Sequence, residues 1–213
     1  MPISVKICGL STPAAVCAAI EGGASHVGFV FFAASPRAVT PDVMAALCMP
    51  VPAAITRVGL FVDASFDEIA AAVATGSLDM LQLHGNETPG MVAQIKESFK
   101  LPVMKAVAIA SEDDIATARL YEITADRLLF DAKPPAGADR PGGNALSFDW
   151  RLIADQQWLL PWMLAGGLDV SNLAEALAIS GASAVDVSSG VEDEPGVKNP
   201  EKIKQLLELA NTL

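Results

Sequence analysis

Short apolar runs alternate with amphipathic, alanine-rich runs along almost the whole of this chain, and this alternation is the strongest constraint on its fold. The apolar runs are rich in Val, Ile, Leu and Phe, as expected of strands that helices cover. They predict strands at residues 4–7, 26–31, 56–61, 80–83, 103–107, 128–130, 162–164 and 184–187. The runs between them predict helices at residues 12–21, 41–47, 66–74, 89–98, 112–120, 150–154, 171–179 and 200–209.

Eight strand–helix pairs in this order predict one α/β domain over residues 1–213, a closed parallel (β/α)8 barrel of the TIM type. The alternative is an open, doubly wound sheet, but no Gly-rich dinucleotide turn follows the first strand. The long loop at residues 134–147, rich in Pro, Gly and Ala, is expected to be functional or mobile.

The charge and the cysteines restrict the class of function. With 14 basic and 25 acidic residues the formal net charge is −11, and no basic cluster favours nucleic acid as a partner. A small anionic substrate is still compatible, because backbone amides bind anions locally. The three cysteines form no CxxC pair and the chain has 2 histidines, so neither a disulfide framework nor a metal site is expected. No membrane span is expected, and the cysteine usage fits a reducing cytoplasm.

Polar or small residues follow six of the predicted strands. Because active sites of closed parallel barrels lie where strands end, these residues are expected to share one pocket. They are Cys8-Gly9, Ser35-Pro36-Arg37, His84-Gly85, Asp131, Gly166-Gly167 and Ser188-Ser189-Gly190.

The alternation of side chains along a strand adds residues below these ends. Lys6 shares a face with Cys8, and Gln82 shares a face with His84. Facing inward is the less costly placement, since outward polar groups would lie buried under helices. A buried lysine needs a partner, and the last strand neighbours the first in a closed barrel. We therefore predict an ion pair between Lys6 and Asp186.

Several motifs in order resemble one known family. The motifs are Val-Lys-Ile-Cys-Gly-Leu at 5–10, Ser-Pro-Arg within 28–39, Gln-Leu-His-Gly-Asn-Glu at 82–87, the Asp131 segment, Phe-Asp-Trp at 148–150, 165–168 and 185–198. Together they are similar to the phosphoribosylanthranilate isomerases of tryptophan biosynthesis. The resemblance implies an Amadori rearrangement of N-(5-phosphoribosyl)anthranilate to the open-chain carboxyphenylamino-deoxyribulose phosphate, without cofactor or metal.

The resemblance also implies roles for individual residues. Asp131 would be the general acid that protonates the furanose ring oxygen, and Cys8 the general base that removes the C2 proton. Arg37 would bind the anthranilate carboxylate with its forked guanidinium. His84 either orients the substrate or satisfies a hydrogen bond, and Lys6, Gln82 and Asp186 are placed with it on the substrate side.

Two turns at consecutive strand ends are expected to bind the phosphate group. Gly166-Gly167 and Ser188-Ser189-Gly190 follow the seventh and eighth strands, where this fold usually holds phosphate. The chain departs from the family at Ala145, where a further glycine is often found, and at Asn199, where Asp is common.

Other readings of the same barrel are possible. The histidine-pathway isomerase is expected to have Asp where this chain has Cys8. Indole-glycerol-phosphate synthase and the tryptophan synthase α subunit need Lys–Glu or paired-carboxylate sites that are not found here. A non-catalytic barrel that binds phosphometabolites would not need Cys8 and Asp131 together.

Overall fold

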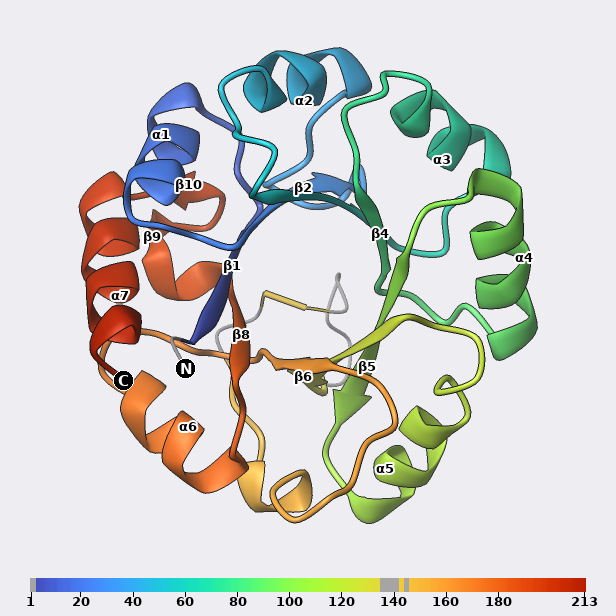
Figure 1. The fold of residues 1–213 in the computed structure, drawn as a ribbon, viewed down its shortest axis with the longest axis vertical. Coiled ribbons are helices and arrows are strands. Elements are labelled where there is room, and N and C mark those ends of the chain that lie inside the picture. Colours follow the sequence, from blue (N-terminus) through green and yellow to red (C-terminus); the bar gives the residue numbers. More distant parts are fainter. Residues whose placement is uncertain (1–2, 135–141, 144–145) are drawn as a thin grey trace.

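Eight parallel strands close into a barrel in a computed structural model that describes residues 3–134, 142–143 and 146–213. Each strand pairs with the next in chain order, and β8 pairs with β1 to close the ring (Figure 1). This confirms the predicted closed (β/α)8 barrel. The strands are β1 Ser4–Cys8, β2 His26–Phe31, β3 Thr56–Phe61, β4 Met80–Leu83, β5 Val103–Ile109, β6 Arg127–Ala132, β7 Trp162–Leu164 and β8 Ala184–Val187.

Helices surround the barrel, and the sequence marks where most of them begin. Thr12, Thr40 and Thr88 each cap a helix whose first turn holds a proline, which has no N–H to leave unpaired. Ser65 and Glu68 form a capping box. The helices are α1 Pro13–Glu21, α2 Pro41–Cys48, α3 Phe66–Val73, α4 Pro89–Phe99, α5 Glu112–Arg119, α6 Leu173–Ser180 and α7 Pro200–Thr212.

Two regions differ from the sequence-based prediction. The helix expected at 150–154 is a single 3-10 turn, η1 Trp150–Leu152, because the apolar run there is too short for an α-helix. After β8 the chain forms η2 Ser189–Val191 and then an antiparallel pair, β9 Glu192–Glu194 and β10 Val197–Lys198, which the sequence did not predict. The predicted behaviour of the loop at 134–147 falls largely on 135–141 and 144–145, which lie outside the described residues.

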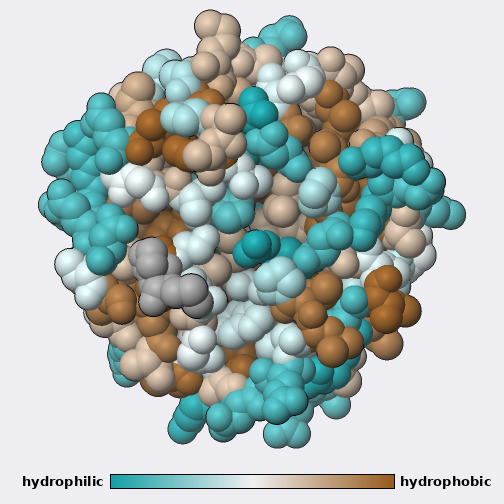
Figure 2. Space-filling view, in the orientation of Figure 1, coloured by the Kyte–Doolittle hydropathy of each residue, from teal (hydrophilic) through white to brown (hydrophobic). Residues whose placement is uncertain are grey.

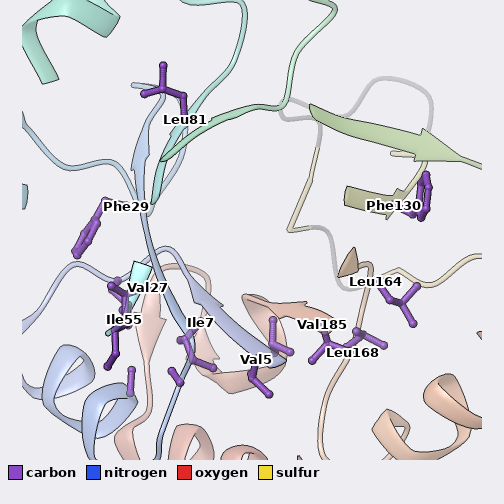
Figure 3. Close-up of a cluster of buried hydrophobic side chains, with 14 of the residues drawn as sticks. Val5, Ile7, Val27, Phe29, Ile55, Leu81, Phe130, Leu164, Leu168 and Val185 are labelled. Carbon is purple, nitrogen blue, oxygen red and sulfur yellow. The ribbon is translucent and has the colours of Figure 1, made fainter. Parts of the chain in front are cut away.

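Two apolar layers flank the sheet. Outward side chains of the strands, such as Val5 and Ile7 of β1, pack in a layer between the barrel and its helices (Figure 3). A smaller cluster fills the barrel interior, with Val58, Met104 and Leu129 among its members. The alternation therefore directs Lys6 and Cys8 of β1 inward, as predicted.

The exterior is mixed in polarity. Figure 2 shows hydrophilic side chains around much of the rim, interrupted by apolar groups. In the portion of the chain that is described, no helix has the length and apolar character needed to cross a bilayer.

Candidate active site

An open pocket of about 660 Å³, its mouth included, lies at the carboxyl ends of the strands. Its polar lining comes from several strand ends and includes Cys8, Arg37, His84, Asp131 and Asp186. One wall is apolar and is made by Val30, Phe32, Leu60 and Val62. The pocket therefore offers an apolar wall beside groups that can transfer protons and bind anions.

Cys8, the last residue of β1, stands above a buried ion pair. Lys6 Nζ lies 2.9 Å from Asp186 Oδ1, which confirms the predicted pair between β1 and β8. Gly28 on β2 leaves room for both residues of β1. A Cβ at Gly28 would lie 3.0 Å from Lys6 Nζ and 3.1 Å from Cys8 Sγ.

The surroundings of Cys8 act on its ionisation in opposite directions. Burial raises the pKa of the Cys8 thiol, the Lys6 ammonium lowers it, and the Asp186 carboxylate raises it again. Burial also opposes the charge on Lys6, but Asp186 and Cys8 together outweigh this effect, and the pKa of Lys6 is raised. The thiol is thus buried, and the Lys6 ammonium is held beside it.

On another side of the pocket, Asp131 of β6 contacts His84, and His84 in turn contacts Gln82 of β4. Asp131 Oδ2 lies 3.2 Å from His84 Nε2, and His84 Nδ1 lies 3.1 Å from Gln82 Nε2. The other carboxylate oxygen, Oδ1, accepts a hydrogen bond of 2.8 Å from the Ala132 amide. Gly166, with φ +89°, passes so close that a Cβ would lie 2.8 Å from the Ala132 nitrogen.

Arg37 is held rigidly at the edge of the pocket. Its Nε and Nη2 donate to the two carboxylate oxygens of Glu192 at 2.7 and 2.8 Å. Glu192 also accepts a hydrogen bond of 2.6 Å from Lys198 Nζ. This leaves Arg37 Nη1 free of side-chain partners among the described residues, close to the Gly143 backbone.

Glu192 and Lys198 are site residues that the sequence reasoning missed. Both stand in the motif at 185–198, but an isolated charge in a loop is most simply interpreted as solvated. Burial lowers the pKa of Lys198 to about 8, although Glu192 opposes this shift. Lys198 also donates to the carbonyl and hydroxyl oxygens of Ser188, so it fixes the turn that follows β8.

The ends of β7 and β8 provide backbone donors. Gly167 and Ser189 line the pocket, and their N–H groups have no backbone acceptor in the described segments. Gly166 and Ser188 line the pocket beside them. Paired turns with free amides are suited to an anion such as phosphate.

Three residues expected at the site lie outside the pocket lining. Lys6 and Gln82 are fully buried in the layer beneath it, so they act on a bound molecule only through Cys8, Asp186 and His84. Gly190 lies in η2, where it packs against the Leu168 carbonyl. The described residues include no group of three His, Cys, Asp or Glu side chains suited to a metal ion.

The sequence matches a known family over almost its full length. Residues 5–209 match the family described as N-(5'-phosphoribosyl)anthranilate (PRA) isomerase. The chain belongs to this family. A curated N-(5'-phosphoribosyl)anthranilate isomerase from Paramagnetospirillum magneticum is 52% identical over 210 residues, which cover 99% of this chain and 98% of the relative. The Rhodospirillum centenum enzyme of the same name is 50% identical and fully covered.

Solved structures of phosphoribosylanthranilate isomerases agree. The Thermotoga maritima enzyme has a TM-score of 0.89 at 33% identity, with 99% of this chain and 100% of that chain covered. Another solved isomerase, in complex with reduced 1-(o-carboxyphenylamino)-1-deoxyribulose 5-phosphate, has a TM-score of 0.83 at 32% identity, with the same coverage.

One departure from the phosphoribosylanthranilate isomerase pattern has a local structural reason. Asn199 Oδ1 accepts the Glu201 and Lys202 amides and caps α7, as an Asp would. Its amide nitrogen also donates to both oxygens of Asp193, at 3.1 and 3.0 Å. An Asp at position 199 would instead place two carboxylates in contact.

Proposed function

We propose that this chain isomerises N-(5-phosphoribosyl)anthranilate to the open-chain carboxyphenylamino-deoxyribulose phosphate by general acid–base catalysis. The observation that carries the mechanism is that a thiol and a carboxyl, Cys8 and Asp131, line one pocket from the non-adjacent strands β1 and β6. Proton transfer at two positions of one sugar needs two such groups on different sides of it.

Each group has a defined step. Asp131 gives its proton to the furanose oxygen as the C1–O bond breaks, and the anilino nitrogen forms a C=N bond to C1. Cys8, as thiolate, then takes the proton from C2, and the resulting enolamine tautomerises to the ketone. Both groups are buried, Cys8 at 4% and Asp131 at 6% exposure, which limits competition from water.

The rest of the pocket positions the substrate. The apolar wall at Val30 and Leu60 is suited to the anthranilate ring, and Arg37 Nη1 to its carboxylate. The free amides at Gly167 and Ser189 are suited to the phosphate. The reaction moves protons only, so it needs no nicotinamide or metal. Three free cysteines fit a cytoplasmic enzyme.

The decisive experiment is an assay of the purified chain with phosphoribosylanthranilate made in place, with and without a chelator. Cys8→Ala and Asp131→Asn are each expected to lower kcat by roughly 10²-fold or more, with a smaller effect on KM. Cys17→Ala is the matched control, since Cys17 is exposed on α1, and it is expected to keep full activity. Near wild-type kcat in either site variant would remove that residue from the mechanism.

Arg37 is tested by binding. Arg37→Ala is expected to weaken binding of a product analogue because the contact with its anthranilate carboxylate is lost. An analogue without that carboxylate should therefore bind wild type and variant about equally. A variant that still discriminates between the two analogues as wild type does would exclude Arg37 as the partner. Glu192→Gln, which retains a partner for the guanidinium, is expected to weaken binding less.

A further inference from the structure

Gln82 lies beneath the pocket with an incomplete set of hydrogen bonds. Its side chain is fully buried in β4, and its Nε2 faces His84 Nδ1 at 3.1 Å. Its Oε1 is buried and has no hydrogen-bond partner in the parts of the chain described. An unpaired buried carbonyl is destabilising, so an apolar residue would serve stability better at this position.

The chain of contacts from Gln82 ends at the proposed acid. His84 Nε2 lies 3.2 Å from Asp131 Oδ2, while the Ala132 amide occupies Asp131 Oδ1. The backbone of Gly142 covers this contact, since a Cβ there would lie 2.6 Å from Oδ2 and 3.0 Å from the His84 ring. The ring of His84 thus links the Gln82 amide to the Asp131 carboxyl beneath the Gly142 backbone.

The two ends of the Gln82 amide require different protonation of this ring. With the NH2 group toward Nδ1, that nitrogen must be bare, so the ring proton is on Nε2 and points to ionised Asp131. With the carbonyl oxygen toward Nδ1, the ring carries a proton there, and a second proton is shared between Nε2 and Asp131. The pair holds one proton in the first case and two in the second.

We propose that Gln82 is a positioning residue whose amide orientation sets the number of protons on the His84–Asp131 pair. The carbonyl-facing orientation stabilises the pair that still holds the proton for the furanose oxygen. The NH2-facing orientation stabilises the pair after that proton has left, and water restores the proton once product has gone. Both orientations make the same number of hydrogen bonds, and a half-turn of the amide exchanges them. This inference rests on the proposed role of Asp131 as acid.

Among the described residues, the titratable side chain that contacts His84 is Asp131. At the next residue of the chain, Lys105 and Glu87 both bind the Gly85 backbone and pair with each other at 3.0 Å. Across the pocket, Asp186 is paired with Lys6, and Cys8 stands beside that pair.

Imidazole nitrogen NMR tests the proposal directly. The chain has 2 histidines, His26 and His84, so the ring signals of His84 are compared with one other set. Burial, with help from Arg127 and Lys6, lowers the pKa of His26 to about 4, so its signals serve as a constant reference. For His84 we expect Nδ1 to be the nitrogen that loses its proton as the pair discharges on raising the pH, while Nε2 keeps one. If Nε2 instead becomes the bare nitrogen, the amide does not turn and the proposal is overturned.

Gln82→Met provides the second measurement. It removes the acceptor for the Nδ1 proton, so the His84 transition is expected at lower pH, and kcat is expected to fall at least about tenfold with KM little changed. Met163→Leu, another fully buried change inside the barrel, is the matched control and should alter neither. An unmoved His84 transition in a folded Gln82→Met protein would reduce Gln82 to a packing residue. The NMR result does not depend on turnover, so failure of the proposed isomerase activity would be seen separately in wild type.

Discussion

Two lysines of the barrel strands, Lys6 and Lys105, each pair with a buried carboxylate but differ in what else the ammonium contacts. Lys105 of β5 donates to Glu87 and to three backbone carbonyls, those of Leu83, Gly85 and Ala106, at 2.7–3.3 Å. Lys6 of β1 donates to Asp186 and, among the described residues, to no backbone carbonyl, and its ammonium also lies beside the Cys8 thiol.

This difference separates a structural ion pair from one that acts on chemistry. The three N–H groups of Lys105 are fully used by Glu87 and the backbone carbonyls, and burial lowers its pKa against the opposing effect of Glu87. Lys6 has spare donors, and its charge lowers the pKa of Cys8. We infer that a buried cation influences a site when its hydrogen bonds are not already saturated by the backbone.

The largest expected effect is on stability, from Lys105→Met. It leaves Glu87 buried without its partner, which should lower the free energy of unfolding by about 3–5 kcal/mol. Urea unfolding followed by tryptophan fluorescence measures this, and adding Glu87→Gln should recover part of the loss. A loss under about 1 kcal/mol would contradict the structural assignment of this pair.

Acid should destabilise the Lys6 side of the barrel through His26, which is in register with Lys6 on β2. The pKa of His26 is lowered to about 4 in the folded protein, so the unfolded chain binds its proton first as pH falls below about 6.5. Stability is therefore lost between these two values, by up to about 3 kcal/mol. Urea unfolding at neutral and acid pH should show a smaller loss in His26→Gln, and an equal loss would contradict this assignment.

Lys6→Met should change the chemistry of Cys8. Without the ammonium, burial and Asp186 both act to raise the pKa of the thiol. The pH dependence of alkylation at Cys8, in a chain carrying Cys17→Ala, measures this shift. The same measurement in Lys105→Met should give the wild-type curve, and an unmoved curve in Lys6→Met would make Lys6 a scaffold residue only.

The smallest effect is expected from Gly28→Ala. The added Cβ presses on Lys6 Nζ and Cys8 Sγ, so a loss of about 1 kcal/mol and a lowered kcat are expected. Gly90→Ala in α4 is the matched control, because the only atom near its Cβ lies 3.9 Å away. Equal kinetics of the two variants would show that the spacing of Lys6 and Cys8 is not important.

The sequence by itself determined the barrel, the family and most of the pocket. Strand and helix periods are local properties, and caps such as Thr88 followed by a proline mark helix starts within a few residues. The alternation along β1 also predicted the Lys6–Asp186 pair, since closure of the barrel brings β8 next to β1. The 3-10 turn at η1 and the β9–β10 pair were missed, because neither has a periodic signal of its own.

Only the tertiary structure decided how the polar groups share their partners. Glu192 and Lys198 are isolated loop charges in the sequence, and only the fold places them around Arg37. Lys6 and Lys105 are both lysines of buried strands, and the number of carbonyl groups near each ammonium separates their roles. Likewise, the unpaired oxygen of Gln82 is visible only once β4 and β6 lie in place. Hydrogen-bond saturation depends on the positions of several distant segments at once, which no local pattern encodes.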